Sequence, residues 1–215
     1  MAAVNLPTTV VEYATQAIRE GILGGRYPLG SRLDQSGLAA ALRTSMIPVR
    51  EALRRLDAEG LVSISPRRGA FVTGLSPEEL REIYLIRESL DDLAVKHAVP
   101  NLTARDLDGM QSLLREMDGA TRAEDLERLL GLNREFHFLI YRAAGLPRLL
   151  QLITNLWDHY SLYARIYMPR HALTSNHDHQ AIYDACVGRD AERAAHLTAR
   201  HIGSAAHAMM RAVGK

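Results

Sequence analysis

Apolar residues recur at helical spacing in three segments near the start of the chain. We expect a first helix over about residues 8–23, where every third or fourth residue is apolar, and Gly24-Gly25 ends it. A second helix is expected over about residues 35–42. The third runs from Ser45 to about Glu59, because one apolar stripe joins Val49, Leu53 and Leu56. The first third of the chain is therefore predicted to be a cluster of short helices.

The third helix carries a marked chemical asymmetry. Ser45 is placed to accept a hydrogen bond from a free backbone N–H at the helix start, and Pro48 fits the first turn, where a missing N–H costs little. Arg50 and Arg54 lie off the apolar stripe. A short helix that is buried on one side and cationic on the other suits the major groove of DNA. Basic amphipathic helices are also common as plain solvated faces, so this segment alone leaves both interpretations open.

Two short β-prone runs follow the third helix, at residues 61–65 and 70–73. A Pro/Gly turn separates them, which predicts a hairpin with Arg67, Arg68 and Gly69 at its tip. The arginines could meet phosphate or enter the minor groove, and Gly69 would let the backbone approach closely. Three helices followed by a hairpin predict a winged helix-turn-helix over residues 1–75.

No strand pattern follows Leu75. Ser76 and Pro77 mark a new helix start, and breaks are expected near Gly119 and at other Gly- or Pro-containing points. The predicted helices cover about residues 77–98, 103–119, 122–144, 147–168, 175–188 and 190–212. The whole chain is thus predicted to be mainly α, with the N-terminal winged helix-turn-helix joined to a C-terminal all-α helical bundle over residues 76–215.

Charge is divided between the two parts of this 215-residue chain. Residues 1–75 hold nine arginines, no lysine and six acids, which gives +3, and the remainder of the chain sums to −2. A basic N-terminal third fits a polyanionic partner, although +3 is weak support. The single Cys186 excludes an intramolecular disulfide, and no apolar run approaches the roughly 20 residues of a membrane span. We therefore expect a cytoplasmic protein without a membrane partner or a signal peptide.

All nine histidines lie between His97 and His207. Asn133 and His137 are four residues apart beside one buried stripe, so both can point inward together. His179 and His201 occupy inward positions of two other helices. Three imidazoles and one amide oxygen from three helices could surround one metal ion. On spacing alone, a hydrogen-bonded core role for each histidine is the more common outcome, and His177 is an alternative to His179.

Arg87 falls on the inner stripe of the first helix of the bundle. A buried arginine needs a carboxylate partner. That partner could be a small organic acid held between Arg87 and the metal, or it could be Glu88 or another internal acid. Tyr163 and Arg165 are weaker candidates for the wall of such an effector site.

The N-terminal part resembles the GntR family of bacterial transcription regulators. The matching motifs are GRYPLGSRL from Gly25, PVREALRRL from Pro48, EGLV from Glu59 and RRGAFV from Arg67. The resemblance implies a homodimer that binds a two-fold symmetric operator in double-stranded DNA. It places Ser36, Ser45 and Met46 at the DNA-binding surface together with the arginines. Met46 departs from the usual arginine at a base-reading position, so Arg50 is expected to carry more of the sequence recognition.

The C-terminal part resembles the effector domain of the FadR-like branch of this family, the all-helical FCD type. The matching motifs are NREFH from Asn133, HQAI from His179 and RHI from Arg200. The resemblance implies a divalent metal held by an aspartate and three histidines, and Zn, Ni and Mn are the candidate ions. Asn133 stands where the family has the aspartate. A neutral amide is a weaker ligand, and it leaves the site one charge more positive, which favours an anionic effector.

These features predict a transcriptional regulator, expected to be a repressor, whose operator binding changes when a small carboxylate metabolite binds the bundle. Two alternatives stay open. One is a metal-dependent hydrolase with a DNA-binding appendage. Against it, no nucleophile and base have a spacing in the sequence that indicates a catalytic pair, and the helical angle turns Glu135 away from His137. The other is a DNA-binding dimer that has no ligand and uses its histidines as core residues.

Overall fold

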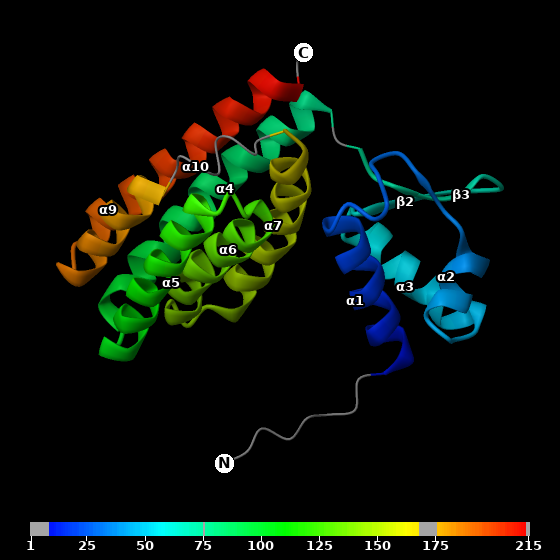
Figure 1. Ribbon diagram of the computed structural model, residues 1–215, viewed down its shortest axis with the longest axis horizontal. Coiled ribbons are helices and arrows are strands. Elements are labelled where there is room, and N and C mark those ends of the chain that lie inside the picture. The colour runs from blue at the N-terminus through cyan, green and yellow to red at the C-terminus, as the bar shows by residue number, and fades with distance from the viewer. Residues whose placement is uncertain (1–8, 75, 168–175, 214–215) are drawn as a thin grey trace. The chain divides into compact units, whose positions relative to one another are not determined.

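The computed structural model describes residues 9–74, 76–167 and 176–213, without the side chains of 159–162, 164–167, 176 and 212–213 (Figure 1). The chain divides into two compact units, residues 1–74 and 75–215. Each unit has its own core, and each is described separately.

The first unit contains the three predicted helices. They are α1 (Val10–Leu23), α2 (Gln35–Ala41) and α3 (Met46–Ala58). Thr9 and Glu12 form a capping box at the start of α1, and the Asp34 side chain accepts from two backbone N–H groups at the start of α2. These caps satisfy backbone donors that have no partner within the helix. Local capping therefore explains where α1 and α2 begin.

A three-stranded antiparallel sheet follows in the order β1-β3-β2. The hairpin of β2 (Val62–Ser65) and β3 (Gly69–Val72) confirms the predicted wing. The strand β1 (Arg32–Leu33) was not predicted, because two residues are too few to show a strand period. Its residue Leu33 pairs with Ala70 and is also buried. The first unit is therefore a winged helix-turn-helix.

The core of the first unit joins α1 to α3 and the wing. Its fully buried side chains include Ile18, Leu53 and Leu56. The backbone N–H of Ile64 on β2 donates to Asp57 Oδ1 on α3 at 2.9 Å. This hydrogen bond connects the wing to the C-terminal part of α3, the helix that is predicted to bind DNA.

Six α-helices form the described part of the second unit, which confirms the predicted all-α bundle. They are α4 (Pro77–Ala98), α5 (Ala104–Arg122), α6 (Leu126–Ala143), α7 (Pro147–Tyr167), α9 (Asn176–Val187) and α10 (Ala191–Val213), with a short 3₁₀ helix η1 (Val99–Asn101) after α4. Ser76 and Glu79 form a capping box at the start of α4, with Pro77 in its first turn. This helix start was predicted from the same residues.

The predicted break near Gly119 is wrong, because α5 continues to Arg122. A glycine lowers helix stability without ending a helix, and here the following residue, Ala120, is buried and favours the extra turn. The helix stops where Glu124 adopts a left-handed φ of 53°. Asp125 then caps α6 by accepting from the Arg128 N–H.

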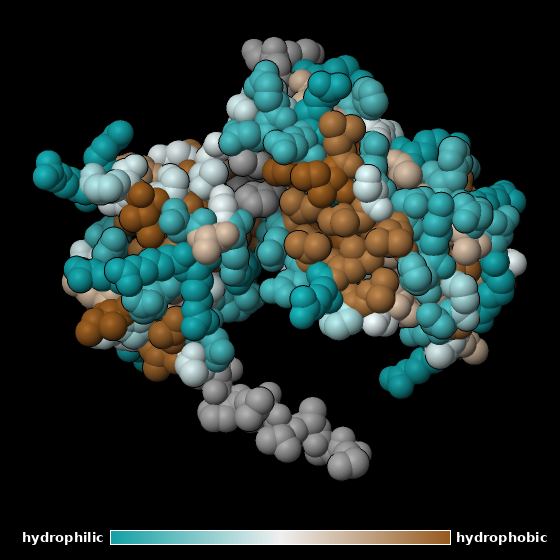
Figure 2. Space-filling view, turned by 180° about the vertical axis from the view of Figure 1, so that it is seen from behind, coloured by the Kyte–Doolittle hydropathy of each residue, from teal (hydrophilic) through white to brown (hydrophobic). Residues whose placement is uncertain are grey.

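Within the bundle, α10 packs along α4 and α9, while α6 packs against α4, α5 and α7 (Figure 1). This packing brings the middle of α6, the start of α9 and the middle of α10 together. Figure 2 shows hydrophobic residues gathered in a broad area on one face of the helical unit. Exposed large apolar residues of α4 are Leu85, Ile86 and Leu93. Among the described residues, no helix has the length and apolarity needed to cross a membrane.

Candidate metal centre and DNA-binding surface

Three histidines from three helices meet inside the bundle. His137 lies on α6, His179 on α9 and His201 on α10, and these residues are 1%, 2% and 6% exposed. One ring nitrogen of each lies within 4.8 Å of the others. The structure thus brings together the three rings that the sequence placed at inward positions. His177, the alternative, is exposed.

The geometry of this cluster fits a metal ion. The Nε2 atoms of His137 and His179 are 3.2 Å apart. Two imidazoles that bind one Zn²⁺ at about 2.0–2.1 Å have nitrogens separated by about 3 Å, so the pair needs little movement to share an ion. Among the described residues the Nδ1 atoms of both rings are buried without a hydrogen-bond partner, so each ring meets its neighbours' polar atoms through Nε2, the atom that faces the other ring. These three histidines could therefore hold a metal ion.

The electrostatics of the cluster also favour metal binding. Burial lowers the pKa of His137 and of His179 well below the usual value, and the neighbouring rings lower each pKa further. Both rings are therefore neutral near pH 7. Neutral imidazole is the form that binds metal, so protons compete weakly for these two rings.

Asp178 adds a carboxylate beside the third ring. Its Oδ2 lies 3.5 Å from His201 Nδ1, and this contact is the main cause that lowers the pKa of Asp178. A carboxylate on Nδ1 favours the tautomer whose Nε2 is free to bind a metal. Asp178 could not be found from the sequence, because its contact depends on how α9 packs against α10.

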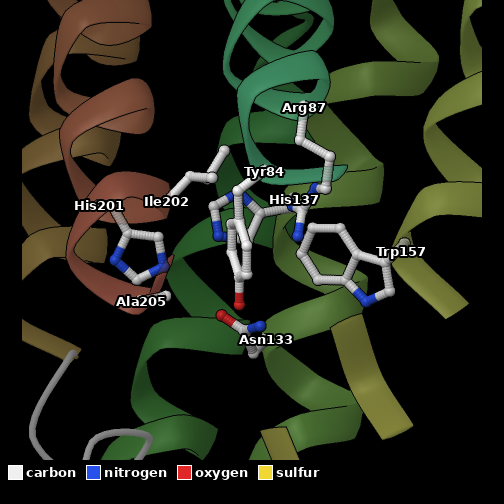
Figure 3. A pocket seen from close by; sticks show the side chains of 8 residues that line it. All are labelled: Tyr84, Arg87, Asn133, His137, Trp157, His201, Ile202 and Ala205. Carbon is white, nitrogen blue, oxygen red and sulfur yellow. The ribbon is translucent and has the colours of Figure 1, made fainter. Parts of the chain in front are cut away.

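A small cavity adjoins His137 and His201 (Figure 3). Its volume is about 10 Å³, which is near the room that a single water molecule needs. Asn133 and His137 both line it, so the two positions predicted to point inward from α6 do share one space. The other lining residues are Tyr84, Arg87, Trp157, His201, Ile202 and Ala205. Figure 3 shows the Asn133 amide beside the Tyr84 hydroxyl.

Arg87 enters this cavity from α4 and has an internal partner. Its Nη2 donates to Asp91 Oδ2 at 3.1 Å, and both side chains are at most 2% exposed. The guanidinium carbon also lies 4.4 Å from the centroid of the Trp157 ring. The internal carboxylate is thus Asp91 rather than Glu88. Burial raises the pKa of Asp91, and the positive charge of Arg87 partly offsets that rise.

Tyr163 and Arg165 are the other two residues that were predicted to line the effector site. Tyr163 is buried on α7, but it is not among the residues that line the cavity. The side chain of Arg165 lies outside the described residues.

The predicted DNA-binding residues of α3 lie on its outer face. Met46, Arg50 and Arg54 are exposed and lie outside the buried stripe. Ser45 is the N-cap, but its side chain makes no capping hydrogen bond, so that part of the prediction is wrong. The reason is that Pro48 occupies the third helical position and has no N–H to donate. The Ser45 hydroxyl is not used by the helix.

Neighbouring polar contacts hold several of these side chains. Arg50 Nε donates to Gln35 Oε1 at 3.3 Å, which links the start of α2 to α3. Ser36 donates from its hydroxyl to Asp34 Oδ1 at 2.7 Å. Arg54 pairs with Glu51 on the same helix. These contacts orient the polar groups without burying them.

The tip of the wing presents its predicted cations. Arg67 and Arg68 are exposed, and Arg68 lies over the ring of Phe71 at 5.8 Å. Gly69 has a φ of +105°, which a side chain would strain. The three residues therefore form a narrow basic turn beside β2 and β3.

Comparison with known proteins identifies both units. Residues 11–72 match the family described as "Bacterial regulatory proteins, gntR family", and residues 82–204 match the FCD domain family. The HTH-type transcriptional regulator McbR of Escherichia coli is 38% identical over 128 residues, which are 60% of this chain and 58% of that protein. The HTH-type transcriptional regulator YdhC of Bacillus subtilis is 28% identical over 181 residues, 82% of this chain and 80% of that protein.

A solved structure supports the same conclusion. The structure of E. coli McbR/YncC superimposes with a TM-score of 0.85 at 28% identity, and the match covers 94% of this chain and 98% of that one. These relatives are transcription regulators, so the hydrolase alternative gains no support and a regulator is confirmed over an enzyme. The chain belongs to the GntR family of DNA-binding transcription regulators, with a C-terminal FCD domain.

Proposed function

We propose that this protein is a homodimeric repressor, located in the cytoplasm, whose binding to operator DNA responds to a small organic acid. The helical unit would hold a divalent metal through His137, His179, His201 and Asn133. The observation that carries this proposal is the convergence of three buried imidazoles from three helices, beside a cavity that Arg87 and Asn133 also line. Zn, Ni and Mn are the candidate ions.

The charge of the site favours an anionic effector. Imidazole and amide groups bind a metal as neutral ligands, so they would leave the positive charge of a bound divalent ion uncancelled. Such an ion supplies a positive centre to which a carboxylate oxygen can bind. Arg87 stands in the same cavity as a second cation. An organic acid would therefore find two positive groups in one small space.

The cavity is too small for an organic acid without rearrangement, and this supports a switch. Arg87 is held by Asp91, so an incoming carboxylate would have to compete with Asp91 for the guanidinium. Both residues lie on α4, whose first residue, Pro77, follows closely on the end of the winged unit. A change in how α4 packs would thus act on the helix that leads from one unit to the other.

The winged unit would place α3 in the major groove. Arg50, Arg54, Ser45, Met46 and Ser36 would contact bases and phosphates there. The wing residues Arg67, Arg68 and Gly69 would lie along the adjacent backbone or minor groove. For the homodimer, the exposed apolar residues of α4 offer a surface that a second copy could cover.

Metal analysis of the purified protein tests the proposal. We expect about one ion per chain, lost when His137, His179 or His201 is replaced by alanine. Asn133→Asp is the matched variant in the opposite direction, because a carboxylate should bind the same ion more tightly than the amide does. Titration of a chelator-treated sample measures both effects. Wild-type protein that binds none of the three ions would favour the dimer without a ligand, whose histidines are core residues.

DNA binding is tested separately by electrophoretic shift on a selected operator. Arg50→Ala should lose specific binding while the helical content stays unchanged. Unchanged affinity would contradict the placement of α3 in the groove. Because these assays need no metal, the two halves of the proposal can fail independently.

A further inference from the structure

The first turn of α3 exposes two consecutive apolar side chains. Ile47 is 71% exposed, the highest value among the large apolar side chains that the structure describes, and Met46 is 39% exposed. Neither belongs to the inward stripe, whose members Val49, Ala52, Leu53 and Leu56 are at most 1% exposed. Ile47 therefore contributes little to the core of the winged unit, and an isoleucine is not a strong helix former.

The surroundings of this pair are polar and cationic. Arg50 lies one turn later on the same exposed side of the helix, and its Nε donates a hydrogen bond to Gln35. The Ser45 hydroxyl precedes the pair and makes no capping bond. Two apolar side chains between a hydroxyl and an arginine form a smaller apolar area than protein interfaces usually have. Such a surface is suited to a partner that presents both polar and apolar groups.

The major groove of DNA offers such a mixture. Base edges present donors and acceptors there, and the thymine C5-methyl is the apolar group that an apolar side chain can contact. The residues of a recognition helix that reach base edges come from its N-terminal part, where Met46 and Ile47 lie. The side chains of Met46 and Ile47 have no hydrogen-bonding N–H or O–H group, so a base contact made by either side chain would be apolar.

We infer that Ile47, assisted by Met46, recognises thymine methyl groups in the operator next to the base contacted by Arg50. This inference rests on the proposed placement of α3 in the major groove and adds a sequence preference to it. Polar readout by Arg50 and apolar readout by Ile47 would then select a guanine with thymines near it. Ile47 is a specificity-determining residue under this assignment, while the phosphate contacts stay independent of sequence.

Replacing thymidine by deoxyuridine tests the contact directly, because the two bases pair identically and differ by one methyl. An operator is first selected from random duplex DNA with the wild-type chain, and each thymidine is then replaced singly. We expect at least one replacement to weaken wild-type binding about fourfold, which corresponds to about 0.8 kcal/mol for one buried methyl. Ile47→Ala should bind the thymine and uracil forms of that position equally.

Two variants serve as controls. Val10→Ala removes an apolar side chain that is 53% exposed on α1, and it should keep the full preference for thymine over uracil. Ile47→Val keeps a branched side chain and should keep part of the preference. Circular dichroism checks that the variants retain the wild-type helix content, which their exposed positions lead us to expect.

The outcomes separate this inference from the function on which it rests. If the wild type selects an operator but never distinguishes thymine from uracil, the methyl contact is excluded while DNA binding stands. If Ile47→Ala keeps the preference, Ile47 is not the residue that recognises the methyl. If dimer assembly rather than operator preference changes in Ile47→Ala, this surface binds a second copy. Failure to select any sequence would contradict the DNA-binding proposal itself.

Discussion

The outer face of α3 and the histidine cluster of the bundle place their functional groups in opposite environments. On α3, Arg50, Arg54 and Ile47 are exposed to solvent, and the proposed contact with DNA would cover them. In the bundle, His137 and His179 are almost fully buried, so folding has already desolvated both side chains. At an exposed site, single ion pairs contribute little to folding stability, so substitutions are tolerated. At a buried site, the loss of one partner leaves a charge or polar group unpaired and lowers stability strongly.

Two of the intrahelical ion pairs make this contrast measurable. Arg87 and Asp91 on α4 are 2% and 0% exposed, whereas the side chains of Arg54 and Glu51 on α3 are 71% and 48% exposed. Similar chemistry at similar spacing thus operates in two dielectric environments. The free energy of unfolding should depend strongly on the first pair and weakly on the second.

The largest effect is expected from Asp91→Ala. This variant leaves the Arg87 charge buried without its carboxylate, which should lower the free energy of unfolding by about 3–5 kcal/mol. Urea denaturation measures the loss. The double variant Arg87→Met with Asp91→Leu is the control, because replacing a buried pair with apolar side chains is often close to neutral. A small loss in Asp91→Ala would mean that other groups compensate the arginine.

A second prediction concerns pH in metal-free protein. Burial lowers the pKa of His137 and of His179, so below about pH 6.5 the unfolded chain binds protons that the folded chain refuses. Stability is therefore fully present above that pH and falls as the solution becomes more acidic, by up to about 1.4 kcal/mol per pH unit for each ring. Thermal melting between pH 7.5 and 5 checks this. His179→Gln should reduce the slope, and an equal slope would exclude His179 as a contributor.

Part of this architecture follows directly from the sequence. The helix start at Ser76 and Pro77, the wing around Gly69 and the inward positions of the histidines are local patterns, and the structure contains them. The pairing of β1 was missed because a two-residue strand has no period. The extension of α5 past Gly119 was missed because the burial of the next turn, rather than local propensity, decides where that helix ends.

The polar partners around the site were harder to predict. Asp91 lies four residues after Arg87, a spacing that could have suggested the pair, but Glu88 offered another acid and burial made the choice. Asp178 reaches His201 only through the packing of α9 on α10. Sequence periodicity shows which face of a helix is buried, but it does not show which residues of another helix meet that face.

Asp178 provides the third prediction. If its carboxylate holds His201 in the tautomer that exposes Nε2, Asp178→Asn should lower metal affinity about 10- to 100-fold. Competition with a coloured chelator measures the affinity. Asp184→Asn is a matched control, since Asp184 is an exposed acid of the same helix that accepts a hydrogen bond from Gln180. Equal affinities for wild type and Asp178→Asn would show that the carboxylate does not act through the ring.

The smallest effect on stability is expected from Arg54→Ala. Its pair with Glu51 is exposed to water and salt, and such pairs contribute about 0.2–1 kcal/mol. The variant should therefore unfold at nearly the same urea concentration as the wild type. Operator affinity should fall more than stability does, and its dependence on salt should weaken by about one counterion, because a phosphate contact is lost. A variant that lost stability but kept its salt dependence would assign Arg54 to the fold of α3 rather than to DNA.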